Sequence, residues 1–414
     1  LEKNVKPGRT VCASGLSTIN KSNIIYALCR LKGVTAFCLA SDEKEAQTLC
    51  NDLSCMGLRA YVYPVRDFNF LDFQSRSHEY EHARLKVLLK LINHECDVAI
   101  ACVDAAAQLT VPRNVLEQSV IEFEEGRELS LEKATKALTL LGYERFDAVE
   151  GSGQFSLRGG ILDFFMPDSD YPVRCEFWGD EITDLSYFDI ETQRRFKKAD
   201  KITLSPSTEI VIEDRAALAD KIEHKAKLLR SKNSAKAKEK LFSEAELIRS
   251  GAMIANADKF INQIYDKPES LFDYLDRNTL VFASEFTAIQ ERGKSMDFIS
   301  NETLMQGFED GTLCRGFDRF ALTFNECTEF LQSHGTIVLE NFVHGSMPIK
   351  LSEIISFSTK QLSAWGGSYK QLKEDVDGLF TPESKGVIFA GTERAAKNLC
   401  DTFNADGINA VYSE

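Results

Sequence analysis

The sequence predicts an α/β protein made of two α/β units, with a small β-rich α+β unit inserted in the first. Three observations support this fold class. In the first part of the chain, short apolar runs alternate with amphipathic helical stretches. Near residue 119 the pattern changes to long predicted strands separated by turn residues. Near residue 278 the alternating pattern returns. Because the first texture resumes after the β-rich part, that part is predicted to be an insertion.

Residues 1–118 are predicted to form the first part of an α/β domain. Strands are expected at 35–41, 60–64 and 97–103, and helices at 43–56 and 78–93. The alternation of strands with helices is typical of a parallel sheet, in which helices connect successive strands.

The β-rich insertion is predicted to span residues 119–208. The helix "LEKATKALTLLG" lies at its start, and its strands lie in "QFSLRGGILDFFMP", "YPVRCEFWGDEI" and "LSYFDIETQRR". Residues 209–335 are expected to continue as charged helices and to complete the first domain through the strand "NTLVFAS". A second, smaller α/β domain is predicted over 336–414, with the strands "GTIVLENF", "EIISFS", "KGVIFAG" and "INAVYS" and a helix that starts at Thr392.

Composition excludes several classes of protein. The net charge is −14, so nucleic acid is not expected as the main partner of the whole module, because phosphate contacts are made by clustered Lys and Arg. No apolar run approaches the ~18 residues that span a bilayer, and the first residues lack the apolar stretch of a signal peptide. Eleven cysteines without paired spacing fit reduced thiols. A cytoplasmic location without membrane contact is expected.

One local basic stretch lies in a polar segment that reads as helical. Its cationic residues are Lys225, Lys227, Arg230, Lys232, Lys236, Lys238 and Lys240. The pattern fits two interpretations, a solvated helix face and a surface that faces DNA or a protein.

The segment "SGLSTINKSN", residues 14–23, resembles a phosphate-binding loop with one part missing. Counted from Gly15, Lys21 and Ser22 stand where such a loop places its lysine and its hydroxyl. Asn20, however, replaces the second glycine, which lets the backbone turn tightly and aim its amides at phosphates. Asn tolerates left-handed backbone conformations better than most residues, so Asn20 weakens the signal without abolishing it.

A magnesium-dependent ATPase of this type also needs an acidic residue at the end of an apolar strand. The strand best placed to supply it is "NTLVFASEFT", which has Ser284 and Glu285 where an Asp-Glu pair would stand. Two parts of one nucleotide site are altered together, so the sequence predicts that hydrolysis is lost. Weak ATP binding without turnover stays open.

The segment "HEYEH", residues 78–82, formally matches a zinc-protease pattern. His78 and His82 would share one face of a helix, as zinc binding requires. The same face continues through Leu85 and Leu89, which marks it as the buried side of an amphipathic helix. A structural role is predicted for both histidines, and no metal site is expected.

Strand alternation in the insertion predicts a polar outer face that carries an aromatic residue. In "YPVRCEFWGDE" the alternation turns Arg174, Glu176 and Trp178 outward. The same parity in "FSLRG" turns Arg158 outward. An outward tryptophan flanked by arginines has the composition of a protein-binding hot spot. The alternative is that Trp178 packs under a loop and that the arginines form intradomain ion pairs.

These strands also carry a family resemblance. The segment "GYERFDAVEGSGQFSLRGGILDFFMPDSDYPVRCEFWGDEITDLSYFDIETQRR" closely resembles the interface domain shared by the excision-repair protein UvrB and the amino-terminal part of Mfd, the bacterial transcription-repair coupling factor. The preceding "VYPVRDFNFLDFQSRSHEYEHARL" and the altered loop "SGLSTINKS" look like the Mfd family in particular. The resemblance spans nearly the entire chain and implies a helicase-derived scaffold of two RecA-like α/β domains.

Three departures separate the chain from UvrB. The UvrB family has an intact phosphate loop and an Asp-Glu metal motif, where this chain has Asn20 and Ser284. UvrB also inserts an aromatic-rich hairpin, where this chain has the short "AAAQLTVPRNVLEQ". In the Mfd family the inserted domain binds UvrA, and the resemblance implies Arg158 and Arg174 as contact arginines and Trp178 as the aromatic anchor, beside Glu176.

The resemblance implies a non-catalytic adaptor, without a cofactor, that recruits UvrA to stalled transcription complexes. RNA polymerase and DNA would be bound only by further domains of a complete coupling factor, and the chain is expected to be an amino-terminal fragment of one. Two alternatives from other classes stay open: an active superfamily-two ATPase or helicase, and a UvrB-like protein that binds damaged DNA.

Overall fold

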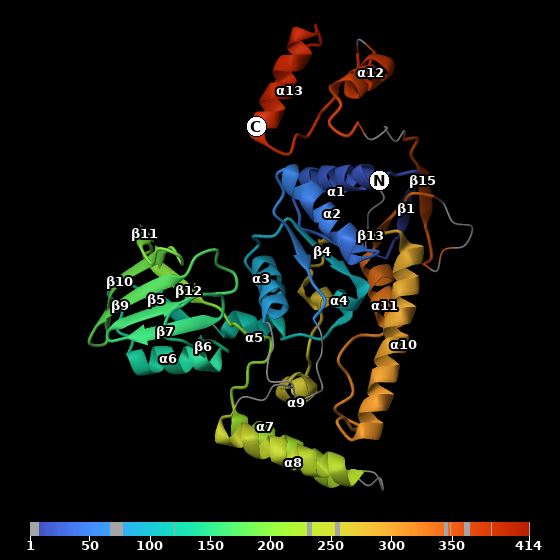
Figure 1. Cartoon of the computed structure of the whole chain (residues 1–414). Coiled ribbons are helices and arrows are strands. Elements are labelled where there is room, and N and C mark those ends of the chain that lie inside the picture. The colour runs from blue at the N-terminus through green and yellow to red at the C-terminus, as the bar shows by residue number, and fades with distance from the viewer. Residues whose placement is uncertain are drawn as a thin grey trace.

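The computed structural model describes residues 8–66, 78–119, 121–229, 234–252, 257–342, 347, 349–359, 365–381 and 383–413. Figure 1 shows a central sheet with helices on both faces, a β-rich unit to one side, a helical hairpin below and two further helices above. None of the helices in this described part of the chain combines the length and the apolar character needed to cross a bilayer.

The central sheet has seven parallel strands in the order β15-β1-β14-β13-β2-β4-β3. They are β1 (Val11–Ser14), β2 (Ala36–Ala40), β3 (Ala60–Tyr63), β4 (Val98–Cys102), β13 (Leu280–Ser284), β14 (Thr336–Glu340) and β15 (Glu353–Ser356). The inner strands are buried along their whole length, as expected for apolar runs covered on both faces. The strands predicted near the start of the chain are confirmed.

Helices cover both faces of this sheet. On one face lie α1 (Thr18–Lys32) and α2 (Glu43–Cys55), whose Leu28 and Leu49 join one apolar core. On the other face lie α3 (Glu79–Ile92), α4 (Val103–Ala107), α10 (Phe286–Asp310) and α11 (Phe324–His334), with α5 (Arg113–Gln118) and η3 (Leu271–Tyr274) beside them. Leu85 of α3 and Ile289 of α10 belong to this second core, so the amphipathic face that continues from "HEYEH" is buried as predicted.

The β-rich unit is inserted between β4 and β13, as the sequence predicts. A six-stranded sheet has the order β11-β10-β9-β8-β7-β6, and β12 pairs with β5 in a small second sheet. The strands are β5 (Ile121–Glu124), β6 (Glu144–Arg145), β7 (Gln154–Arg158), β8 (Ile161–Phe164), β9 (Val173–Trp178), β10 (Glu181–Phe188), β11 (Arg195–Lys198) and β12 (Lys201–Leu204). The helix α6 (Leu131–Leu140) covers the inner face, where Leu138 packs with Phe164 and Cys175.

The chain returns from the insertion to the central sheet through helices, as predicted for the stretch that starts at residue 209. The helices α7 (Arg215–Leu228) and α8 (Ser234–Ser250) form the hairpin at the bottom of Figure 1. They are followed by η2 (Ala257–Phe260) and α9 (Ile261–Ile264), which lead toward β13. Asp214 caps α7 by accepting a hydrogen bond from the Ala217 amide.

The structure differs from the sequence prediction at the boundary placed at residue 336. β14 lies between β1 and β13, and β15 lies beside β1, so both strands belong to the central sheet and not to a separate domain. A parallel strand finds its neighbours through tertiary packing, and the partner β1 lies at the other end of the sequence. Local sequence texture therefore cannot place this boundary.

After β15 the described chain forms two helices, α12 (Tyr369–Leu379) and α13 (Glu393–Ala405). Thr392 caps α13 as predicted, because its side chain accepts from the Ala395 amide. The segments "KGVIFAG" and "INAVYS" were expected as strands, but they pair in no sheet within the residues that the structure covers. Val387 and Phe389 are accordingly exposed.

A buried ionic cluster anchors the chain where it leaves the β-rich unit. Arg84 Nε lies 2.6 Å from Glu209 Oε1, and both side chains are fully buried. Glu81 Oε1 accepts from the Glu209 amide at 2.8 Å, and Arg66 Nη2 lies 2.7 Å from Asp258 Oδ1. Because Glu209 directly follows the β-rich unit and Arg84 belongs to α3, these contacts fix that unit to the central domain.

Candidate functional site

The loop after β1 lies at the carboxyl end of the parallel sheet, the end at which open α/β sheets bind ligands. It starts at Gly15, whose φ of +80° lies in the left-handed region, and leads into the first turns of α1. The fold brings together the residues of the predicted nucleotide site, namely Gly15, Asn20, Lys21 and Ser22 from this loop and helix and Ser284 and Glu285 from the end of β13.

Lys21 uses its amino group within the protein. Its Nζ donates to Glu45 Oε1 at 3.2 Å, to Ser284 Oγ at 2.9 Å and to Glu285 Oε1 at 2.6 Å. An ammonium group has three donors, so each has an internal partner. Burial opposes the charged form of the amine, but the carboxylates of Glu45 and Glu285 outweigh it and raise the pKa of Lys21.

The other polar groups of the loop also have internal partners. Asn20 Nδ2 donates to Ser17 Oγ at 2.7 Å, and Ser22 Oγ donates to Asp52 Oδ2 at 2.9 Å. The chain after β15 packs directly on the loop, since a Cβ placed on Gly15 would lie 2.1 Å from the carbonyl oxygen of Phe357. The lysine, the hydroxyl and the first glycine of the predicted site are therefore all in contact with this chain's own atoms.

Ser284 and Glu285, which sequence analysis predicts to replace an Asp-Glu metal pair, both bind Lys21. Ser284 Oγ also donates to Glu45 Oε1 at 2.5 Å, and Glu285 Oε1 also accepts from the Asn341 amide at 2.9 Å. Glu285 has a φ of +56°, at the start of α10. Across the described ranges, no group of three or more His, Cys, Asp or Glu side chains is arranged to hold a metal ion.

Sequence analysis missed Glu340, the last residue of β14. Its side chain is fully buried, and Oε1 accepts from the Phe286 amide at 2.8 Å. Burial, together with the nearby charge of Glu285, raises the pKa of Glu340 to about 7. The signal was present in "GTIVLE", where an apolar strand ends in an acidic residue.

The outer face of the β-rich sheet carries the second predicted site. Val173, Cys175 and Phe177 point into the core, and Arg174, Glu176 and Trp178 lie on the opposite face, as strand alternation predicts. On that face Ser156 pairs with Asp163, and Asp163 pairs with Arg174, across three adjacent strands.

Arg174 is largely buried, and its guanidinium is used within the unit. Its Nε and Nη2 donate to the two carboxylate oxygens of Asp163, each at 2.8 Å, and its Nη1 donates to the Gln193 carbonyl oxygen at 3.1 Å. The guanidinium also lies 4.4 Å from the centroid of the Phe188 ring. These hydrogen bonds to Asp163 raise the pKa of Arg174. The intradomain ion pairs that sequence analysis left as an alternative are thus present, at Arg174 and also at Arg158.

Arg158 is half exposed, with 51% of its side chain accessible. Its Nη2 donates to Asp163 Oδ2 at 2.8 Å, and Asp163 is itself only 1% exposed. One buried carboxylate therefore orients both arginines. All three guanidinium nitrogens of Arg174 donate hydrogen bonds, whereas Nε and Nη1 of Arg158 donate none to any residue the structure describes.

Trp178 is 82% exposed at the end of β9, so the alternative in which it packs under a loop is wrong. Glu176 is half-buried and forms an ion pair with Arg195, which also lies 3.0 Å from Asp184. Sequence analysis missed Asp163 and Arg195. The period-two alternation that turned Arg174 outward could have found Asp163, because both occupy the same face of paired strands.

The two histidines of "HEYEH" have structural partners, in agreement with the predicted role. His78 Nδ1 lies 2.9 Å from Glu81 Oε2, and His82 Nε2 lies 3.0 Å from Ser207 Oγ. Burial lowers the pKa of His82. Because Ser207 belongs to the chain that leaves the β-rich unit, this end of α3 holds that unit in place.

The basic stretch that sequence analysis singled out is only partly covered by the structure. Lys225 Nζ donates to the Gly316 carbonyl oxygen at 3.3 Å, and Lys227 Nζ lies 3.7 Å from Glu223 Oε2. Arg230 and Lys232 lie outside the described residues. The contacts of Lys225 and Lys227 favour the solvated-face interpretation for these two residues.

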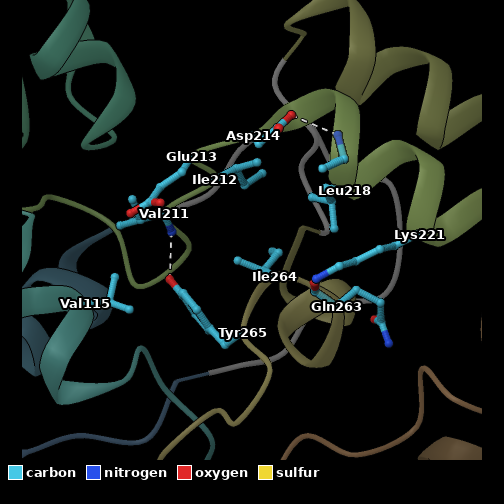
Figure 2. Close-up of a pocket in the computed structure, with 11 residues that line it drawn as sticks. Val115, Val211, Ile212, Glu213, Asp214, Leu218, Lys221, Gln263, Ile264 and Tyr265 are labelled. Carbon is cyan, nitrogen blue, oxygen red and sulfur yellow. Dashed lines mark hydrogen bonds between the residues drawn. The ribbon is translucent and has the colours of Figure 1, made fainter.

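Figure 2 shows a pocket between α5, the start of α7 and α9, away from both predicted sites. Its lining is largely apolar and includes Val115 and Ile264, with Lys221 donating to the Gln263 carbonyl oxygen at 3.3 Å. The pocket volume of about 230 Å³ lies below the range of ~300 Å³ or more usual for small-molecule sites. This hollow is best explained as a packing gap beside the return connection.

The chain is thus an α/β scaffold with an inserted β-rich unit, and the outer face of that unit exposes Trp178 and Arg158. Residues 121–210 match the family described as the UvrB interaction domain. Over most of its length the chain is homologous to the amino-terminal third of transcription-repair-coupling factors.

The similarity to individual coupling factors extends well beyond the β-rich unit. The chain is 26% identical over 405 residues to the transcription-repair-coupling factor of Bacillus subtilis, an alignment that covers 95% of this chain and 34% of that protein. It is 24% identical over 371 residues to the factor of Staphylococcus epidermidis, which covers 85% of this chain and 30% of that protein. The chain therefore spans about a third of the length of the curated relatives that it matches.

Proposed function

We propose that this chain is a non-catalytic adaptor that recruits the repair protein UvrA to stalled transcription complexes. The homology to transcription-repair-coupling factors and the match of the β-rich unit to the UvrB interaction domain support a role in transcription-coupled nucleotide excision repair. The contacts with RNA polymerase and DNA that such recruitment needs would be made by parts of a coupling factor outside this chain.

The observation that carries the proposal is the exposed indole of Trp178 on the same face of the β-rich sheet as Arg158. Aromatic and arginine side chains dominate the energetics of protein interfaces, because they combine a large contact area with directed hydrogen bonds. Arg158 is held by the buried carboxylate of Asp163, so little conformational entropy would be lost when it contacts a partner. Arg158 is expected to meet an acidic group of UvrA, and Trp178 is expected to fill a pocket on it.

Arg174 and Glu176 would take a smaller part in this interface. Arg174 would act mainly by keeping Asp163 and the outer face in place, because its guanidinium is bonded to Asp163 and Gln193. Glu176 would be available only if its ion pair with Arg195 opened on binding.

The contacts of Lys21 support the non-catalytic part of the proposal. A phosphate loop works by offering its lysine to phosphate oxygens, and here Glu45, Ser284 and Glu285 hold that amine. A nucleotide would have to displace two carboxylates and a hydroxyl before Lys21 could reach its phosphates. We therefore expect no Mg-ATP turnover by this chain, with or without DNA. Turnover that is abolished in Lys21→Met would instead support the enzyme alternative.

The recruitment hypothesis is tested by isothermal titration of the whole chain with purified UvrA. Trp178→Ala and Arg158→Ala are each expected to weaken binding by about tenfold or more. Leu140→Ala is the matched control, because Leu140 is an exposed apolar residue on α6 of the same unit, on the opposite side of the sheet. Wild-type affinity in both the Trp178 and the Arg158 variant would refute the assigned surface.

A further inference from the structure

β11 is the terminal strand of the six-stranded sheet, so one of its edges has no partner strand among the described residues. All of Arg195–Lys198 is exposed, and the preceding Arg194 is exposed as well. Figure 1 shows β11 at the upper margin of the β-rich unit. Solvent therefore has access both to the strand edge and to its side chains.

This strand concentrates positive charge in a chain whose net charge is −14. Lys198 lies 2.8 Å from Glu125 Oε2, and Arg195 lies 3.0 Å from Asp184 Oδ2. Arg194 and Lys197 form no ion pair with any part of the chain that the structure describes. Exposed ion pairs such as that of Lys198 are weak, so an incoming polyanion can replace their carboxylates.

Two exposed aromatic rings accompany these cations. Phe196 is 53% exposed and Tyr171 is 48% exposed, and their ring centroids lie 4.7 Å apart in an edge-to-face arrangement. Lysines on an edge strand prevent sheets from joining edge to edge, which would account for the charge alone. Exposed aromatic rings have the opposite effect, so edge protection does not account for Phe196 and Tyr171.

We propose that β11, together with Tyr171, forms a binding surface for single-stranded nucleic acid. Proteins that bind single strands combine cations that follow the phosphate backbone with aromatic rings on which bases stack. Phe196 and Lys197 of β11 and Arg194 directly before it supply both. A single strand fits better than a duplex, because bases that are paired and stacked in a duplex cannot reach a ring on a strand edge.

The surface differs from the proposed UvrA face in its residues and in its place on the sheet. Arg158 and Trp178 lie on β7 and β9, whereas the proposed nucleic-acid surface is the outermost strand of the same sheet. The inference does not depend on the recruitment hypothesis, and either can fail alone.

The test is fluorescence anisotropy of a labelled short oligothymidine titrated with the whole chain at two salt concentrations. The wild type is expected to bind more weakly as salt rises. Arg194→Gln combined with Lys197→Gln should weaken binding about tenfold and reduce the salt slope by about one to two. Phe196→Leu should weaken binding about fivefold or more while leaving the salt slope unchanged, because it removes stacking and no charge.

The matched control is Lys133→Gln combined with Lys136→Gln, which removes the same charge from the exposed side of α6 in the same unit. This control should bind like the wild type. Loss of binding equal to that of the β11 variant, or no salt-dependent binding by the wild type at low salt, would overturn the proposal. A third outcome would also overturn the proposal: polyglutamate displaces the labelled oligothymidine as well as unlabelled oligothymidine does, and Phe196→Leu has no effect on binding. That result would assign the surface to an acidic protein.

Discussion

Lys21 Nζ lies 2.6 Å from Glu285 Oε1, so the lysine of the predicted phosphate loop is paired with the residue that follows the end of β13. The same amine contacts Glu45 of α2. Lys21 thereby connects α1, α2 and the turn into α10 through charged hydrogen bonds.

Replacing Lys21 with Met is expected to destabilise the fold by about 2–4 kcal/mol, because the largely buried carboxylate of Glu45 and the partly buried one of Glu285 lose their counter-ion. The measurement is urea-induced unfolding at neutral pH. Lys44→Met is the matched control, since Lys44 is exposed on α2, and its effect should stay within about 0.5 kcal/mol. Equal unfolding midpoints for the two variants would contradict the role given to the Lys21 contacts.

The free energy of unfolding is expected to fall as the pH rises through the range set by Glu340. Its pKa is raised from 4.5 to about 7, so between these pH values the native state holds a proton that the unfolded chain has released. Glu340 therefore lowers stability progressively from about pH 4.5 to about pH 7, and its effect is constant above that range.

Glu340→Gln keeps a carbonyl oxygen for the Phe286 amide but cannot ionise. The variant should be more stable than the wild type by about 2–3 kcal/mol above pH 7, and this difference should vanish near pH 4.5. Urea unfolding at a series of pH values measures it, with the exposed Glu329→Gln as the control. A stability difference that does not change with pH would rule out titration of Glu340 as its cause.

Periodicity in the sequence was sufficient to predict the β-rich insertion and the residues on the outer face of its sheet. Trp178 and Arg158 are exposed because strand alternation is strict and one face of this sheet packs on α6. The same rule could not distinguish Arg158 from Arg174. Arg174 is more buried than Arg158 because Gln193 lies over its guanidinium. This contact is a property of the tertiary structure.

The sequence pattern also could not predict the partners of Lys21 or the order of the strands in the central sheet. Glu45 comes from a helix that follows a different strand, and no spacing rule connects it to Lys21. The apolar sequence of β14 fits a strand of a new domain as well as a strand of the first sheet. Its pairing with β1 and β13 shows that it belongs to the first sheet.

The Arg84–Glu209 pair is expected to hold the β-rich unit against the central domain. Arg84→Met would leave Glu209 fully buried without its main counter-ion, and removal of one partner from such a pair typically costs about 3–5 kcal/mol. Hydrogen exchange should become faster in residues 205–211, where Glu209 anchors the connection, more than in β2 or β4.

Lys86→Met provides the control for this prediction. Lys86 also lies on α3 and pairs with Asp170 at 3.0 Å, but this pair is exposed and should contribute about 1 kcal/mol or less. If exchange in 205–211 rose equally in both variants, or in neither, the buried pair would not be the anchor.

Arg158 and Arg174 are expected to respond differently to truncation, although both bind Asp163. Arg174→Ala leaves a carboxylate that is 1% exposed with a single hydrogen bond from Arg158, so it should destabilise the fold by about 2–4 kcal/mol and weaken UvrA binding as a consequence.

Arg158→Ala removes a half-exposed side chain and leaves Asp163 paired with Arg174. It should change the free energy of unfolding by less than about 1 kcal/mol while weakening UvrA binding about tenfold. Urea unfolding and isothermal titration of both variants separate these effects. If Arg174→Ala kept wild-type stability and still lost UvrA binding, Arg174 would be a direct contact, and its bonds to Asp163 would have to open when the partner binds.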